Sequence, residues 1–158
     1  MILGITASRR DFTKHVESVV IDLLCRIKPA TVIHGACVGG DIQIVELVHE
    51  FYLNWSEKRP WIVAYPGYSV GTQDRSCQSE RAIQLSDEVM PEQGHFSRNR
   101  EIVNRSSIVM GVTSYWKEQE PEYGSGGGTW MTLQYAHRIG LSYYVVWANG
   151  EVTPRNFS

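Results

Sequence analysis

The sequence has few cysteines, no long apolar run and no signal-peptide pattern. Its three cysteines, Cys25, Cys37 and Cys77, are odd in number and lack the spacing of metal ligands. This pattern favours a reduced cytoplasmic compartment over a disulfide-rich secreted protein. No apolar stretch approaches the roughly 20 residues of a membrane-spanning helix, and residues 1–10 lack the apolar segment of a signal peptide. We therefore expect a cytoplasmic protein with no membrane partner.

The chain also lacks an excess of positive charge. Its 15 Lys and Arg residues face 17 Asp and Glu residues, which gives a net charge of −2. Because nucleic-acid-binding proteins usually carry a basic patch or stripe, nucleic acid is disfavoured as a partner. The length of 158 residues and the hydrophobic content of 42% are those of one globular domain. We assign this domain to residues 1–150, followed by a short tail at residues 151–158, and expect neither a metal nor a cofactor.

Short apolar runs alternate with segments of helical periodicity along the chain. The runs predict strands at residues 2–7, 30–36, 60–66, 107–113 and 142–148. The periodic segments predict helices at residues 11–28, 39–55, 95–106 and 128–140. This alternation favours a doubly wound α/β fold, with a mainly parallel Rossmann-like sheet of five or more strands and helices on both faces. Residues 66–92 are polar and poorly periodic, and the loop within them is either a lid or disordered.

A cluster of glycines, GSGGGT at residues 124–129, stands directly before the last predicted helix. Glycine in a folded element costs roughly 0.5–1 kcal/mol relative to alanine, so the cluster needs a cause. A helix N-terminus offers free N–H groups and partial positive charge to a phosphate, and glycine lets the ligand approach the backbone. Gly126, Gly127 and Gly128 therefore predict a phosphate site, with Thr129 as the helix cap or as a ligand contact. The alternative is a flexible loop with an ordinary cap.

Two further loops follow predicted strands at the edge of the sheet where doubly wound folds bind ligands. The candidate ligand-binding residues in these loops are Thr6, Ser8, Arg9, His34, Gly35, Ala36, Gly39, Gly40 and Asp41. Asp41 is either a helix N-cap or the partner of a ribose hydroxyl. His34 is interpreted first as a satisfied buried histidine and second as a ligand contact. Arg9, which is followed by Arg10, is either a phosphate ligand or part of a solvated pair.

Four segments of the chain, by their order and placement, resemble the SLOG superfamily of Rossmann-like nucleotide-binding domains. The superfamily includes the DNA-processing protein A domain and the Lonely Guy phosphoribohydrolases. The segments are TASR (6–9), VIHGACVGGD (32–41), HFSRNREIVNRSSIVMGV (95–112) and GSGGGTWMTLQYAHRIGLSYYVVW (124–147). The resemblance leaves out roughly residues 66–92 and 114–123. It implies a small stand-alone nucleotide-binding protein, and the dimers common in the superfamily imply a homo-oligomer.

The resemblance implies roles for individual residues. The positions that match superfamily motifs are Gly35, Gly39, Gly40, Asp41, Arg98, Asn99, Gly126, Gly128 and Thr129, with Arg98 and Asn99 in place of an Arg–Lys pair. Thr132 stands where the related hydrolases carry their catalytic Glu, and a threonine does not act as an acid or base at neutral pH. Asp41 or Glu101 would have to replace that carboxylate. Glu101 has a simpler alternative, an ion pair with Arg105 four residues later.

The expected function is the binding of a nucleotide or an ADP-ribose-like small molecule. The related domains that act as sensors in prokaryotic defence systems imply that the chain senses or sequesters such a signal. A nucleotide N-glycosidase or phosphoribohydrolase with a rearranged carboxylate is the alternative. Residues 114–123 add Tyr115, Trp116 and Tyr123, which are candidates for stacking on a base. The same loop carries Glu118, Glu120 and Glu122, so it is alternatively a solvated acidic loop or an oligomer contact.

Overall fold

A computed structural model describes residues 1–53 and 58–158 of the chain. The strands of its central sheet are β1 (Ile2–Ala7), β2 (Thr31–His34), β3 (Trp61–Ala64), β5 (Glu88–Val89), β7 (Ile108–Val112), β8 (Tyr143–Val146) and β9 (Val152–Arg155). They lie in the order β5-β3-β2-β1-β7-β8-β9, and all neighbours run parallel except β8 and β9. Two short strands, β4 (Gly67–Tyr68) and β6 (Gln93–Gly94), pair separately.

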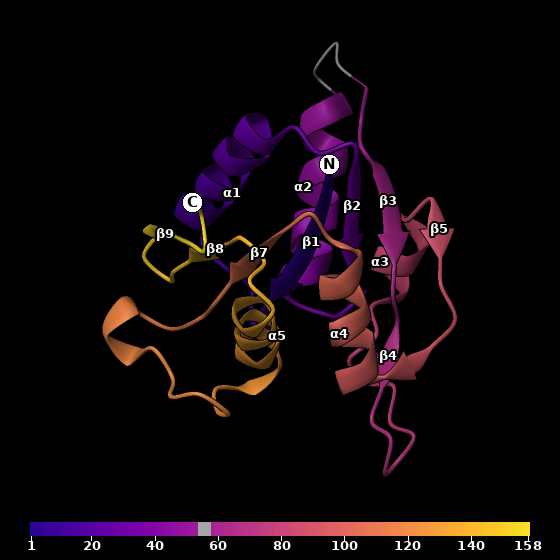
Figure 1. Cartoon of the computed structure of the whole chain (residues 1–158). Helices are drawn as coiled ribbons and strands as arrows, with labels where there is room; N and C mark the ends of the chain where they lie inside the picture. Colours follow the sequence, from indigo (N-terminus) through magenta and orange to yellow (C-terminus); the bar gives the residue numbers. More distant parts are fainter. Residues whose placement is uncertain (54–57) are drawn as a thin grey trace.

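The helices cover both faces of the sheet (Figure 1). They are α1 (Lys14–Ile27), α2 (Gly40–Leu53), α3 (Glu80–Gln84), α4 (His95–Arg105) and α5 (Gly127–Arg138), with one 3-10 turn, η1 (Lys117–Gln119). The largest apolar cluster joins α1 and α2 to one face, and two smaller clusters join α4 and α5 to the other. The predicted doubly wound α/β fold is confirmed. None of the helices described has the length and apolar composition that a membrane crossing requires.

Helix α1 shows why the sequence predicts these elements well. Its buried residues are Val16, Val20, Leu23 and Leu24, whose spacing places them along one side of a helix. The helix begins after Thr13, whose hydroxyl accepts a hydrogen bond from the backbone N–H of Val16 at 3.2 Å. Such an N-cap contributes about 1 kcal/mol to helix stability. Local periodicity and capping therefore agree with the tertiary packing.

The five predicted strands and four predicted helices are all present, with ends shifted by a few residues. The predicted helix at residues 39–55 corresponds to α2, and its last two predicted residues lie outside the described part of the chain. Residues 66–92, where no element was predicted, contain β4, α3 and β5. These elements are two to five residues long, too short to produce a recognisable period.

The C-terminal residues form a strand rather than the tail that the sequence predicted. β9 pairs antiparallel with β8, with Tyr143 opposite Arg155. The guanidinium of Arg155 makes two hydrogen bonds, of 2.6 and 2.7 Å, to the carboxylate of Glu120. Because Glu120 follows η1 directly, this ion pair holds the loop between β7 and α5 against the edge of the sheet.

Close packing on β7 fixes the position of α5. Gly111 of β7 has no side chain where Leu133 of α5 packs, and a Cβ built on it would lie 2.6 Å from a Leu133 methyl carbon. Nearby, the indole N–H of Trp130 donates to the Thr113 hydroxyl at 3.0 Å, and the Trp130 ring packs on Trp147 at 5.4 Å between centroids. These contacts bring the first turn of α5 to the carboxyl end of β7.

Gly111→Val is expected to lower the free energy of unfolding by about 1–3 kcal/mol, because the added methyl groups overpack the contact with Leu133. Urea unfolding measures this loss. Gly71→Val is the matched control, since a Cβ at Gly71 meets nothing within 4 Å. Equal stabilities of the two variants would show that α5 shifts away from β7 at no cost.

Candidate functional site

The main cavity lies beyond the carboxyl ends of β1, β2 and β7 and has a volume of about 1010 Å³. The chain leaves β1 toward β2 on one side, and β7 later joins β1 on the other side. The strand order therefore reverses next to β1, which is the position where open α/β sheets bind their ligands. The walls come from the loops after these three strands, from α4 and from the first turn of α5.

Most of the predicted site residues line this cavity. Those that line it are Thr6, Ser8, Arg9, Gly35, Asp41, Arg98, Asn99, Gly126, Gly127, Gly128 and Thr129. Those that do not are His34, Ala36, Gly39, Gly40 and Glu101. The structure thus brings predicted residues from four separate segments of the chain together at one cavity. It places the other five predicted residues outside the cavity lining.

Gly39 and Gly40, in the loop after β2, pack two loops together instead of lining the cavity. Gly39 has a φ of +87°, and a Cβ there would lie 2.6 Å from the Cα of Arg9. The N–H of Gly40 donates to the Ser8 carbonyl at 2.8 Å. Their role is to let the loop after β2 touch the loop after β1. Glu101 also lies elsewhere, in an ion pair of 3.3 Å with Arg105.

His34 is a satisfied buried histidine, as its first interpretation expected. Its Nδ1 accepts a hydrogen bond from the N–H of Ala36 at 3.0 Å, so its Nε2 carries the proton and donates to the Ser86 hydroxyl at 2.9 Å. Burial, and then the charge of Arg98, lowers the pKa of His34 to about 3. The ring is therefore neutral at physiological pH and braces the loop after β2.

Arg98 of α4 is a buried arginine at the wall of the cavity. Its Nη1 donates to two backbone carbonyls, that of Gly35 at 2.5 Å and that of Tyr65 at 3.0 Å. Its Nη2 donates to His95 at 3.1 Å, and its Nε to the Asn99 side chain at 2.7 Å. Within the residues described, no carboxylate forms an ion pair with it inside 4.0 Å. Its positive charge is therefore held by neutral groups only.

Asp41 is buried in the first turn of α2 and lines the same cavity. Its Oδ2 accepts hydrogen bonds from the N–H groups of Gly35 at 3.0 Å and Cys37 at 3.3 Å, which precede the helix, so it does not act as the predicted N-cap. Its Oδ1 has no hydrogen-bond partner in the described chain. Burial raises the pKa of Asp41 to about 6, against the opposing effects of Arg98 and the two N–H groups. A buried polar atom without a partner is uncommon and favours a ligand contact.

The glycine cluster leaves the N-terminus of α5 open. Gly126 and Gly127 have φ values of 98° and 83°, and no side chain caps the helix, so Thr129 does not play the capping role. A Cβ built on Gly128 would meet only the Nδ2 of Asn99, at 3.9 Å. Because the first N–H groups of a helix lack partners within it, this end of α5 presents backbone donors to the cavity.

Gln134 of α5 holds the loop that carries these glycines. Its Oε1 accepts a hydrogen bond from the N–H of Gly124 at 2.9 Å, and its Nε2 donates to the Glu122 carbonyl at 3.2 Å. The acidic side chains of residues 114–123 do not line the cavity, although Tyr115 does. An anionic ligand in this cavity would therefore not meet the acidic side chains of residues 114–123.

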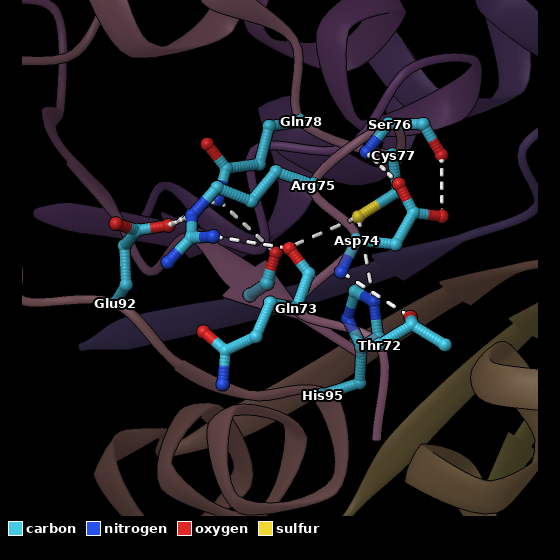
Figure 2. A network of polar contacts seen from close by, with 10 residues as sticks. Thr72, Gln73, Asp74, Arg75, Ser76, Cys77, Gln78, Glu92 and His95 are labelled. Carbon is cyan, nitrogen blue, oxygen red and sulfur yellow. Dashed lines mark hydrogen bonds and ion pairs between the residues drawn. The ribbon is translucent and has the colours of Figure 1, made fainter. Parts of the chain in front are cut away.

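Polar contacts join the segment predicted as a lid or as disordered to the start of α4 and to Glu92 (Figure 2). Arg75 and Gln78 both bond Glu92, at 2.6 and 2.8 Å, and the sulfur of Cys77 lies 3.5 Å from His95. His95, which begins α4, lines the cavity together with Ser69 from the start of the loop. The sequence prediction missed both residues. Only the spacing of three between His95 and Arg98 on one helix face signals His95 in the sequence.

The charged residues of the cavity are mostly basic. Arg9, Arg10 and Arg98 line it, and Asp41 is the sole carboxylate among the lining residues described. The chain as a whole has a net charge of −2, so positive charge is concentrated at this cavity. Its chemistry therefore favours an anionic ligand. In the residues described, no group of His, Cys, Asp and Glu side chains is arranged to hold a metal ion.

No protein-family model matches the chain, and no curated protein is significantly similar to it. The resemblance to the SLOG superfamily therefore remains a prediction from the order of the motifs.

Asp41 is expected to make stability depend on pH. Its pKa of about 6 in the folded protein lies above the ordinary value of 3.8, so the folded state disfavours the ionised carboxylate. The stabilising contribution of the protonated form is complete below pH 3.8 and is lost as the pH rises through about 6. The loss amounts to roughly 3 kcal/mol.

Asp41→Asn removes this titration, so the stability of the variant relative to wild type should increase between pH 4 and pH 7 in urea unfolding. His34 has the opposite effect: its lowered pKa gives a contribution that is present above pH 6.5 and lost as the pH falls toward 3. It is present in both proteins, so it cancels in the difference. Parallel pH profiles would contradict the role given to Asp41.

Proposed function

We propose that the chain binds a nucleotide or an ADP-ribose-like small molecule through a phosphate group. The observation that carries the proposal is the uncapped, glycine-rich N-terminus of α5, which opens into a cavity lined by three arginines. Backbone N–H groups at a helix N-terminus and arginine side chains are the donors that phosphate oxygens accept best. The SLOG resemblance of these loops independently supports the same ligand class.

The cavity has the volume, a free acceptor oxygen and the aromatic side chains to hold more than a phosphate. Its volume of about 1010 Å³ is at the upper end of the roughly 300–1,000 Å³ typical of small-molecule sites. Asp41 offers a buried oxygen without a partner, which suits a ribose hydroxyl as donor. Tyr115 and Phe96 line the cavity and offer ring faces to a base. These groups favour a nucleotide over inorganic phosphate.

Thr132 supports nucleotide binding without turnover. Thr132 is among the residues that line the cavity, and its hydroxyl donates to the Gly128 carbonyl at 2.7 Å. The hydrolases of the superfamily that the chain resembles carry a carboxylate at the matching position. A protein that holds a nucleotide and does not cleave it is suited to sense or sequester that nucleotide as a signal.

A nucleotide N-glycosidase is the second candidate, and Asp41 is the observation that favours it. Of the two carboxylates considered from the sequence, Glu101 lies outside the cavity and Asp41 lines it. A pKa of about 6 is near the range of a general acid at neutral pH. In this alternative, Asp41 would donate a proton to the departing base or stabilise the cationic sugar.

Gly128→Val is expected to weaken nucleotide binding at least tenfold, because its side chain would occupy the open space in front of the N-terminus of α5. This loss corresponds to one charge-assisted hydrogen bond, worth about 1.5–3 kcal/mol. Calorimetry with a panel of 5′-nucleotides and ADP-ribose measures it, and a thermal melt checks the fold. Gly71→Val is the control. Gly128 is preferable to Gly127, whose φ of +83° would strain any substitution. Unchanged affinity in a folded Gly128→Val protein would make the glycine loop a linker only.

The wild-type protein is expected to release no free base from the nucleotides that it binds. Chromatography of the bound and released species measures this directly. Base release at many turnovers per minute that is lost in Asp41→Asn would replace the binding function with the N-glycosidase. Because removing one positioned acid–base group costs about 10²–10⁴-fold in rate, the two proteins would then differ clearly.

A further inference from the structure

The side chain of Asn99 lies between the buried Arg98 and the open N-terminus of α5. Helices α4 and α5, which carry these groups, stand side by side (Figure 1). The Nε of Arg98 donates a hydrogen bond to the Oδ1 of Asn99 at 2.7 Å. Asn99 lines the main cavity, and its Nδ2 lies 3.9 Å from the position that a Cβ on Gly128 would take. The amide therefore has its oxygen on Arg98 and its nitrogen near the first turn of α5.

Arg98 determines which way the Asn99 amide points. A guanidinium nitrogen only donates hydrogen bonds, whereas a side-chain amide has an accepting oxygen and a donating nitrogen. The oxygen of Asn99 must therefore face Arg98, and its NH₂ group points away from the guanidinium. Among the residues described, no group accepts a hydrogen bond from this NH₂ group. Asn99 thus offers a free donor at the wall of the cavity.

The guanidinium of Arg98 is enclosed and has no free donor of its own. All three of its nitrogens donate to protein groups, which include Asn99 and the carbonyls of Gly35 and Tyr65. A Cβ built on Gly35 would lie 2.7 Å from its Nη1, and one built on Gly67 would lie 2.9 Å from its Cζ. Hydrogen bonds in a chain polarise one another in a low-dielectric interior. The charge of Arg98 therefore makes the NH₂ group of Asn99 a stronger donor.

The backbone at the start of α5 adds donors on the other side of the same space. Among the residues described, nothing accepts a hydrogen bond from the N–H groups of Gly127, Gly128 or Thr129. All three residues line the main cavity, as Asn99 does. Donors from two helices thus border the space in front of Gly128, and a phosphate has acceptor oxygens on every side.

A separate feature of the cavity also indicates a ligand. Asp41 is only 4% exposed, and its Oδ1 has no hydrogen-bond partner in the described chain. A Cβ built on Gly35 would lie 3.1 Å from the Oδ2 of Asp41 and 2.7 Å from the Nη1 of Arg98. Arg98 therefore has the acceptor Asp41 near one nitrogen and the donor Asn99 at another. A ligand with its anion at Asn99 keeps that anion away from the carboxylate.

We propose that Asn99, oriented and polarised by Arg98, donates to the phosphate of the ligand together with the N-terminus of α5, an inference that rests on the proposed function. Asn99 is then the ligand contact, and Arg98 is its positioning residue. The buried charge of Arg98 reaches the ligand through a neutral amide. The contact recognises the phosphate of a nucleotide and is of no use to a nucleoside that lacks one.

The test compares wild type and Asn99→Asp by calorimetry with the four common ribonucleoside 5′-monophosphates. The substitution keeps an oxygen that accepts from Arg98, but it replaces the donating nitrogen with an oxygen of the carboxylate. A purely structural role of Asn99 would survive this change, so a thermal melt should show a folded protein. The affinity for the best 5′-monophosphate is expected to fall at least tenfold, because a hydrogen bond is lost and a negative charge faces the phosphate.

The matched control is Asn104→Asp, which adds the same charge to the same helix. Asn104 does not line the main cavity, and its Oδ1 accepts a hydrogen bond from the Tyr135 hydroxyl at 2.8 Å. Because water and salt screen an exposed charge, this variant is expected to keep the affinity within about twofold of wild type. Equal losses in the two variants would overturn the role of Asn99, and so would unchanged affinity in Asn99→Asp.

Wild type provides a second readout that needs no substitution. In two-dimensional ¹H–¹⁵N spectra, the side-chain NH₂ signals of Asn99 are expected to shift when the 5′-monophosphate is added, while those of Asn104 stay in place. Signals of Asn99 that do not move at saturation would overturn the inference. If Gly128→Val loses binding while Asn99 does not respond, the proposed function stands and this inference fails. If no nucleotide binds wild type, both fail.

Discussion

The cavity is built around one buried cation, Arg98, that forms no ion pair with a carboxylate of residues 1–53 or 58–158. Arg98 bonds the backbone carbonyls that follow β2 and β3 and so ties α4 to the ends of both strands. Desolvating a charge is costly unless hydrogen bonds compensate, and here the compensation comes from carbonyls, His95 and Asn99. Asp41 lies close enough for Arg98 to lower its pKa, yet burial dominates and keeps that pKa high. Because Asn99, the carbonyls of Gly35 and Tyr65, Cys37 and His95 engage all the N–H groups of Arg98, its charge acts on the cavity through the electric field and not through a free donor.

This arrangement gives Arg98 a structural role in addition to the ligand-side role proposed for it. Replacing it with alanine would leave the carbonyls of Gly35 and Tyr65 without their donor, and an unpaired buried group costs about 1–3 kcal/mol. A loss of binding after that change would not separate a missing ligand contact from a distorted wall. Arg9, an exposed residue of the same cavity, does not have this double role. Substitutions of exposed residues such as Arg9 therefore test the proposed ligand contacts more cleanly than substitutions of Arg98.

The sequence predicted the long buried elements well, because continuous apolar strands and striped helices carry their own periodicity. It missed β5, which has two exposed residues, and β9, which is four residues long, mostly half-buried and contains Pro154. In the site, the glycines were ambiguous for a different reason. Gly39 and Gly128 look alike in the sequence, but Gly39 packs on the backbone of Arg9, about thirty residues away in the chain, whereas a Cβ on Gly128 would meet only the Nδ2 of Asn99, at 3.9 Å. Only the tertiary structure shows which glycine faces a neighbouring loop and which faces the cavity.

The loop that carries the glycine cluster is fastened on both sides. Glu120 is bonded by Arg155 of β9, and Gln134 bonds the backbone at Glu122 and Gly124. Fixing the backbone of one free residue costs roughly 1–2 kcal/mol of conformational entropy. These hydrogen bonds fix the loop in the folded protein without a ligand. Under the proposed function, association would then proceed without a slow ordering step, and the heat of binding would report the ligand contacts themselves rather than the folding of a segment.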